Sequence, residues 1–117
     1  MTLFDKDGSP VAYFDDDNET IFLWNGTPVA YLDNENIYGF NGQHLGWFED
    51  GIIWNHDGEK AGFNKDSLPV FAKFEPFKEF KQFKPFKAFK EFEPFKPFKS
   101  NIVSKMDFAE YLKIGIK

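Results

Sequence analysis

The sequence contains no cysteine, which excludes a disulfide framework and a zinc site built on cysteine thiolates. It also has no apolar run near the roughly 20 residues that a membrane-spanning helix requires. The first residues, Met1 to Asp5, lead into a charged turn, so we expect no signal peptide and a cytoplasmic location by default. The 117 residues suffice for one modest domain.

The common catalytic signatures are missing as well. There is no glycine-rich phosphate loop, no nucleophile elbow and no His-Glu-x-x-His motif. His44 and His56 do not recur at one repeat position, so we interpret them as hairpin side chains instead of a metal site or a general base. The acidic run 15–19 lacks the ligand spacing of a calcium loop and is interpreted as a solvated turn. We therefore predict no enzymatic activity, no cofactor and no metal.

Positive charge is scarce in the first part of the chain. Residues 1–70 carry 13 acidic and 3 basic side chains, whereas residues 71–100 carry 4 acidic and 8 basic ones. The acidic first part argues against a nucleic acid as partner. The opposite charges favour docking of the basic segment on the acidic one, within one chain or between chains.

Residues 1–66 contain a fourfold internal repeat. An Asx-Gly pair recurs with its glycines 18, 16 and 16 residues apart, and each pair lies between two apolar runs. The pairs are Asp7-Gly8, Asn25-Gly26, Asn41-Gly42 and Asp57-Gly58. Asx-Gly between two such runs is typical of a β-hairpin with a type I′ turn, in which both central residues have positive φ. The repeat predicts four β-hairpins.

A small residue follows each turn at the same position, next to a large aromatic one. The small residues are Ala12, Ala30, Gly46 and Gly62. Such a repeated small side chain indicates close approach of the backbone around a shared centre. A single hairpin cannot bury enough surface, so we expect the four to cover one another about a pseudo-four-fold axis, which makes the fold class all-β.

Phenylalanine recurs ten times at a strict spacing of three between Phe71 and Phe98, and proline marks each nonapeptide at Pro76, Pro85 and Pro94. This period fits neither a strand, which alternates by two, nor an α-helix, which regular prolines would break. Polyproline II has three residues per turn, so it places every phenylalanine on one edge. We predict a polyproline II tract over 74–100, after a join at 67–73. The alternative is a disordered linker.

The phenylalanine edge predicts a packing surface. Burial of each ring contributes roughly 2 kcal/mol, so the stripe gains on the order of 20 kcal/mol from a surface that covers it. That surface belongs to this chain, to another copy or to a different molecule, and we favour a tract that curves around the hairpins with some self-association. The predicted packing residues are Phe74, Phe77, Phe80, Phe83, Phe86, Phe89, Phe92 and Phe95.

The tail, residues 101–117, predicts one short helix over about 105–113. Ser104 is a suitable N-cap, with an acidic residue three positions later. An apolar face then follows, made by Met106, Phe108, Tyr111 and Leu112.

The segment IFLWNGTPVAYLDNENIYGFNGQHLGWFEDGIIWNHDG (21–58), followed by a tract of period three, resembles the bacterial 4-fold β-flower proteins. The resemblance implies four hairpins that radiate from a centre and a proline- and lysine-rich tract after them. It implies no activity and transfers no catalytic residue. In relatives we associate the apolar position of the tract, which recurs every three residues, with valine. This chain has phenylalanine at that position throughout.

Two functions are open at this point. The first is a structural or protein-interaction module in which the tract packs on the hairpins or is shared between copies. The second is a carbohydrate-binding or cell-surface module in which aromatic rings of the hairpins contact a glycan. The candidate rings are Trp24, Tyr31, Tyr38, Trp47 and Trp54, which are equally suited to a small β core or to a seat for the tract.

Overall fold

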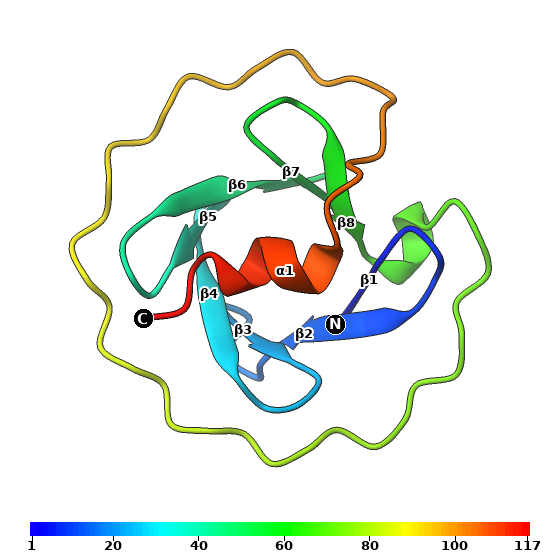
Figure 1. The fold of residues 1–117 in the computed structure, drawn as a ribbon, viewed down its shortest axis with the longest axis horizontal. Coiled ribbons are helices and arrows are strands. Elements are labelled where there is room, and N and C mark those ends of the chain that lie inside the picture. The colour runs from blue at the N-terminus through cyan, green and yellow to red at the C-terminus, as the bar shows by residue number, and fades with distance from the viewer.

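Eight short strands form a closed barrel in the computed structural model, which describes residues 1–117 (Figure 1). Each strand pairs in antiparallel orientation with the next, and β8 closes the barrel on β1 by pairing Phe63 with Phe4. The strands are β1 (Thr2–Phe4), β2 (Pro10–Phe14), β3 (Thr20–Leu23), β4 (Pro28–Asp33), β5 (Asn36–Gly39), β6 (His44–Glu49), β7 (Ile52–Trp54) and β8 (Lys60–Phe63). A 3₁₀ turn, η1 (Lys65–Ser67), follows β8.

The four predicted hairpins and the all-β fold are confirmed, but the predicted turn type is wrong. A type I′ turn needs two successive residues with positive φ. At the first tip only Gly8 has positive φ (81°), and its N–H donates to the Asp5 carbonyl at 3.1 Å. The strand register shifts beside each tip, as expected of a glycine bulge. Two successive positive φ angles occur instead at Asp50 and Gly51, between β6 and β7.

One cross-strand pair recurs four times in the core. In each hairpin a fully buried leucine or isoleucine on the first strand faces alanine or glycine on the second. The pairs are Leu3 with Ala12, Ile21 with Ala30, Ile37 with Gly46 and Ile53 with Gly62. The small partners let the four hairpins approach a common centre, as the repeat predicts.

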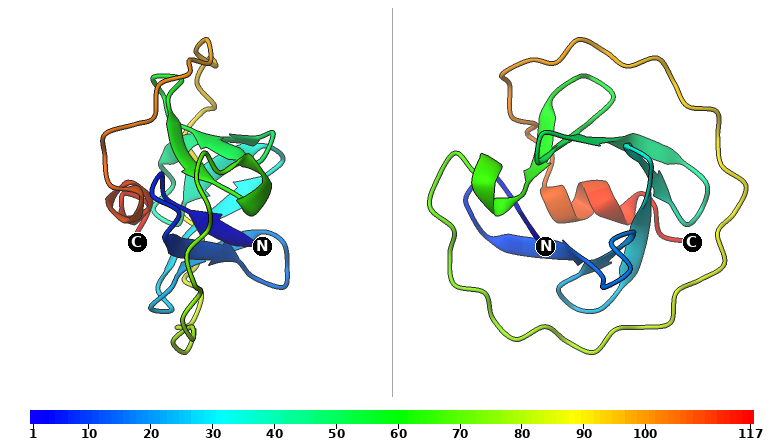
Figure 2. Two further views of the ribbon diagram at one scale, coloured as in Figure 1. Left: turned by 90° about the vertical axis from the view of Figure 1, so that its right-hand side faces the viewer. Right: turned by 180° about the vertical axis from the view of Figure 1, so that it is seen from behind.

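The helix α1 (Phe108–Lys113) lies across the centre of the barrel in the face-on view and on one face in the edge-on view (Figures 1 and 2). It begins three residues later than predicted, because the Asp107 carboxylate caps it by accepting the Glu110 N–H at 3.1 Å. Met106 therefore precedes the helix and is exposed. No helix of the structure has the length and hydropathy to cross a membrane.

Two glycines of the repeat make room for α1. A Cβ atom on Gly62 would overlap the ring of Phe108, and one on Gly46 would overlap the hydroxyl of Tyr111 and the Trp54 carbonyl. The Tyr111 hydroxyl donates to the Leu45 carbonyl at 2.6 Å, and burial raises its pKa. The third and fourth hairpins thus carry glycine where the first two carry alanine, which explains why the repeat departs from strict symmetry.

The tract encircles the barrel as the outermost layer and leaves one side open (Figure 1). The whole molecule is a disc of 37 × 37 × 22 Å, and the tract follows its rim (Figure 2). No backbone hydrogen bond joins two residues of the tract, as expected of polyproline II. At about 3.1 Å per residue, the stretch from 73 to 100 spans about 84 Å, close to three quarters of the circumference of a 37 Å circle.

Candidate functional site

The tract docks on the barrel with one nonapeptide between each hairpin tip and the next. Four tract N–H groups, each nine residues after the last, donate to the carbonyls of the four tip glycines at 2.8 to 2.9 Å. The pairs are Lys73 with Gly8, Gln82 with Gly26, Glu91 with Gly42 and Ser100 with Gly58. Two further N–H groups, of Glu79 and Ala88, donate to the carbonyls of Trp24 and Phe40 at 3.1 and 2.9 Å. The nonapeptide period therefore matches the hairpin repeat in space.

The tip glycines serve both the turn and this docking. Gly26 has φ of 89°, where a side chain is strained, and a Cβ atom there would overlap the carbonyl of Phe80. The same overlap recurs at the other three tips with Phe71, Phe89 and Phe98. Glycine is thus the one residue that lets the tract backbone reach the tip.

We expect Gly26→Ala to lower the free energy of unfolding by about 1–3 kcal/mol and to loosen the tract at that tip. Limited trypsin digestion should then cut after Lys81 faster than in the wild type. Gly51→Ala is the matched control: it has a comparable φ of 77°, but its Cβ would meet the Asn64 side chain instead of the tract. Equal digestion of the two variants would contradict the proposed role of the tip.

Lysines on the inner edge of the tract bind carboxylates at the turns between hairpins. Three equivalent ion pairs are spaced nine residues apart along the tract, with distances of 2.5, 2.6 and 2.6 Å. They join Lys81 to Asp15, Lys90 to Asp33 and Lys99 to Glu49. Further pairs join Lys84 to Asp15 and Asp17, Lys87 to Glu19, Lys96 to Glu35 and Glu49, and Lys99 to Asp50.

The ion pairs shift the pKa values of the carboxyl groups. Hydrogen bonds from Lys96 and Lys99 lower the pKa of Glu49 from 4.5 to about 2. A hydrogen bond from Lys81 likewise lowers the pKa of Asp15. The lysine side chains remain exposed, so solvent screens each pair and its contribution to stability is small. Their main effect is to select the edge of the tract that faces the barrel.

The run 15–19, which we interpreted as a solvated turn, supplies part of this interface. The carboxylates of Asp15, Asp17 and Glu19 bind lysines of the tract at distances between 2.5 and 3.1 Å. Their spacing in the sequence does not match that of a calcium loop. In the structure these carboxylates bind the ammonium groups of tract lysines instead. The charge imbalance between the two parts of the chain was the signal that pointed to this contact.

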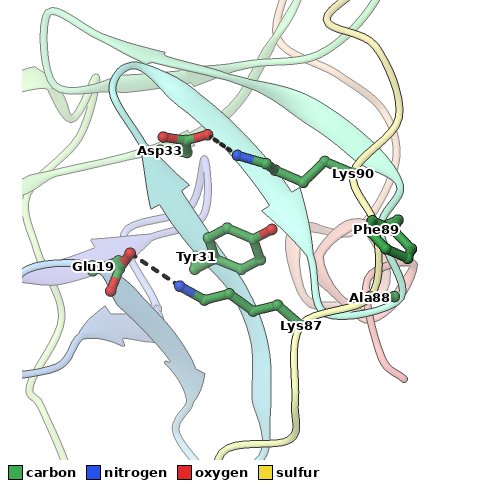
Figure 3. A pocket seen from close by; sticks show the side chains of 7 residues that line it. All are labelled: Glu19, Tyr31, Asp33, Lys87, Ala88, Phe89 and Lys90. Carbon is green, nitrogen blue, oxygen red and sulfur yellow. Dashed lines mark hydrogen bonds and ion pairs between the residues drawn. The ribbon is translucent and has the colours of Figure 1, made fainter.

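Aromatic rings lie beneath the same lysines. Figure 3 shows Tyr31 between the side chains of Lys87 and Lys90, which reach from the tract to Glu19 and Asp33 on either side of the ring. The Lys87 ammonium lies 4.2 Å from the centre of the Tyr31 ring. Equivalent cation–π contacts place Lys78 over Tyr13 and Trp24, Lys81 over Phe22, Lys90 over Tyr38 and Lys99 over Trp54.

The candidate glycan-contacting rings therefore form no exposed platform. Four of them are buried, and the fifth, Trp24, is half-buried and donates its Nε1–H to the Pro76 carbonyl at 3.0 Å. The buried four are Tyr31, Tyr38, Trp47 and Trp54. A sugar ring needs an open aromatic face, and tract lysines or neighbouring strands occupy these faces. The rings act as core and as seat for the tract.

The phenylalanine edge of the tract faces solvent. All ten rings from Phe71 to Phe98 are between 87% and 102% exposed, and in Figure 3 Phe89 points away from the barrel. Within the chain, the eight predicted packing residues thus make no contact with the core: Phe74, Phe77, Phe80, Phe83, Phe86, Phe89, Phe92 and Phe95. The tract has opposite lysine and phenylalanine edges, and the acidic seats of the barrel bind the former. Packing of the rings against another molecule remains a prediction.

Two histidines that the sequence did not connect lie side by side. His44 Nδ1 is 2.9 Å from His56 Nε2, and His44 Nε2 is 2.9 Å from the Asn36 Oδ1, which must accept. His44 is therefore the Nε2–H tautomer, and its Nδ1 accepts from His56. Burial, with a smaller effect of His56, lowers the pKa of His44 from 6.5 to about 4.

The strand register would not have predicted this pair. The β6–β7 ladder ends at Trp47 with Trp54, and its regular extension would place His44 and His56 on opposite faces of the sheet. No group of three or more histidine, cysteine, aspartate or glutamate side chains is arranged to hold a metal ion. The two imidazoles are hydrogen-bond partners of each other, and His44 also bonds Asn36.

The structure thus defines an all-β protein with four hairpins about a pseudo-four-fold axis and an extended tract docked on the hairpin tips. The model of the 4-fold beta flower protein family matches residues 1–112, and the chain belongs to this family. The expected resemblance is confirmed. No curated protein and no solved structure matches the chain. Membership assigns a fold and carries no activity with it.

Proposed function

We propose that this protein is a non-enzymatic interaction module that holds its phenylalanine edge outward as a binding surface. The barrel is the scaffold, and the ten rings from Phe71 to Phe98 form what we call the phenylalanine rim. The observation that carries the proposal is the exposure of every ring of the rim, 87% at the least.

The size of the rim supports this function. A phenylalanine side chain offers roughly 150–250 Å² of surface, so ten exposed rings present on the order of 1,500 Å² of apolar surface. Soluble monomers expose contiguous apolar patches of only a few hundred Å², and larger ones mark interaction sites. An unbound rim of this size would cost solubility without any benefit to the fold.

The docking of the tract supports it further. Hydrogen bonds at four hairpin tips and ion pairs between them fix the backbone of the tract, so the rings are held in place before any partner arrives. Preorganisation of this kind reduces the entropy lost on binding. A flexible tract of the same composition would have to be ordered first.

The rim should govern retention of the full chain on a phenyl-substituted resin. We expect the variant Phe83→Ser, Phe86→Ser, Phe89→Ser to elute clearly earlier than the wild type, with an unchanged circular dichroism spectrum and urea midpoint. The matched control, Ile102→Ser, Met106→Ser, Ile116→Ser, removes three exposed apolar side chains outside the tract and should elute near the wild type. Equal elution of all three proteins would show that the rim is not accessible and would refute the proposal.

A further inference from the structure

The hairpins divide nine of the ten rings of the rim among three equal sides. Between successive docking points at Lys73, Gln82, Glu91 and Ser100, the tract presents three phenylalanines to each side, and the tenth, Phe71, precedes Lys73 at the first hairpin tip. The first side holds Phe74, Phe77 and Phe80, the second Phe83, Phe86 and Phe89, and the third Phe92, Phe95 and Phe98. All three lie at the edge of a disc only 22 Å thick (Figure 2).

We propose that the occupant of each side is the rim of a second copy, so that the discs join edge to edge into a single layer. This inference rests on the interaction function proposed above and names its partner. Three arguments carry it: the spacing of the rings, the charge around them and the shape of the rim.

The spacing suits interdigitation of two identical rims. In an extended tract, consecutive phenylalanines are about 9.3 Å apart, so a ring from a second copy placed midway lies about 4.7 Å along the rim from each neighbour. Fanning of the side chains on a convex rim increases this separation slightly. Aromatic rings prefer centroid separations of about 4.5–7 Å. Only a partner of the same period meets this condition at every ring, and a second copy has that period.

The charge around the rim favours a second copy over an anionic partner. Six lysines of the inner edge have carboxylate partners on the barrel, so they do not attract lipid headgroups or nucleic acid. They are Lys81, Lys84, Lys87, Lys90, Lys96 and Lys99. The chain has a net charge of −5, which repels anionic membranes. A second copy carries the same net charge, but the two rims meet through uncharged rings, and salt screens the remaining repulsion between the barrels.

The convex rim makes each contact small. Two discs of 37 Å diameter touch over a short arc, so about three rings from each copy interdigitate and bury on the order of 600–1,000 Å². Stable pairs bury about 1,200–2,000 Å², so a single contact is weak, with Kd in the micromolar to millimolar range. A disc with three such sides gains avidity from several neighbours. Association should therefore extend to a layer once the concentration passes a threshold.

Sedimentation velocity on the full chain, from about 1 μM to about 2 mM, tests the proposal, since this range brackets the expected Kd. The wild type should change from a monomer to large, heterogeneous species, and electron microscopy should show layers one disc thick. A variant with serine at the six phenylalanines of the second and third sides should stop at dimers. A variant with serine at all ten should stay monomeric, and the Ile102, Met106, Ile116 control should assemble like the wild type.

Three outcomes would overturn the inference. If the wild type stays monomeric at every concentration while the rim still governs retention on the phenyl resin, the interaction function stands and the partner is not a second copy. If the monomeric wild type also sediments with vesicles of neutral phosphatidylcholine, the occupant is lipid. If the ten-serine variant assembles like the wild type, the contact lies outside the rim. Loss of the phenyl-resin difference would instead refute the interaction function itself.

Discussion

Replacement of Phe108 by alanine should lower the free energy of unfolding by about 3–5 kcal/mol, whereas replacement of Phe89 should change it by less than about 0.5 kcal/mol. Phe108 is 2% exposed and packs over Gly62 in the core, and Phe89 is 102% exposed on the rim. The loss of stability at Phe108 is the sum of two terms: the lost free energy of burying the ring and the cost of the cavity that remains beneath α1. Urea unfolding followed by tryptophan fluorescence, at dilute protein, measures both values.

The two variants form their own control, because the chemical change is identical and only the surroundings differ. A third variant, Leu112→Ala, should resemble Phe108→Ala with a loss of about 2–5 kcal/mol, since Leu112 is fully buried on the same helix. A comparable loss for Phe89→Ala would mean that the phenylalanine edge of the tract is buried in solution. The assignment of the lysine edge to the barrel would then be wrong.

Acid should destabilise the protein in two steps, the first of which belongs to His44. The folded protein lowers the pKa of this imidazole from 6.5 to about 4, so the unfolded chain binds the proton more tightly. The stability that the neutral imidazole contributes is present above pH 6.5 and is lost as the pH falls towards 4. Between these values the free energy of unfolding should fall by about 1.4 kcal/mol per pH unit, on the order of 3 kcal/mol in all.

The second step belongs to the carboxylates that hold the tract. The pKa of Glu49 is lowered from 4.5 to about 2, and that of Asp15 is lowered as well. Their contribution to the free energy of unfolding is present above about pH 4.5 and is lost as the pH falls through the pKa values of the folded protein. The tract should therefore detach from the barrel at a lower pH than the one at which His44 is protonated.

His44→Gln separates the two steps, because it removes the first titration and leaves the second. Its free energy of unfolding should be nearly constant from pH 6.5 to 4.5, whatever its absolute value, and should then fall as in the wild type. His56→Gln keeps His44 buried but removes the neighbouring imidazole, so the first step should persist over a narrower range. A wild-type slope near zero between pH 6.5 and 4.5 would contradict the neutral, buried state of His44.

Several features follow directly from local sequence. The Asx-Gly pairs predicted the number and place of the hairpins, because glycine adopts without strain the positive φ that a tight turn needs. The turn type did not follow, since both a type I′ turn and a glycine bulge use Asx-Gly. The beginning of α1 was missed for a similar reason: Ser104 and Asp107 are both good caps, and packing of Phe108 on Gly62 decides between them.

The candidate site, like the fold, could be predicted from the sequence only in part. The sequence by itself determined that the tract has a phenylalanine edge and a lysine edge, and that its charge complements that of the hairpins. It did not determine which edge faces inward, because burial favours phenylalanine and charge favours lysine. Only the tertiary structure decided this. Closure of the barrel fills the core with side chains of the barrel and of α1, and it brings the acidic turns to the edge of the disc, beneath the tract. Lysine then has partners on the barrel and phenylalanine has none.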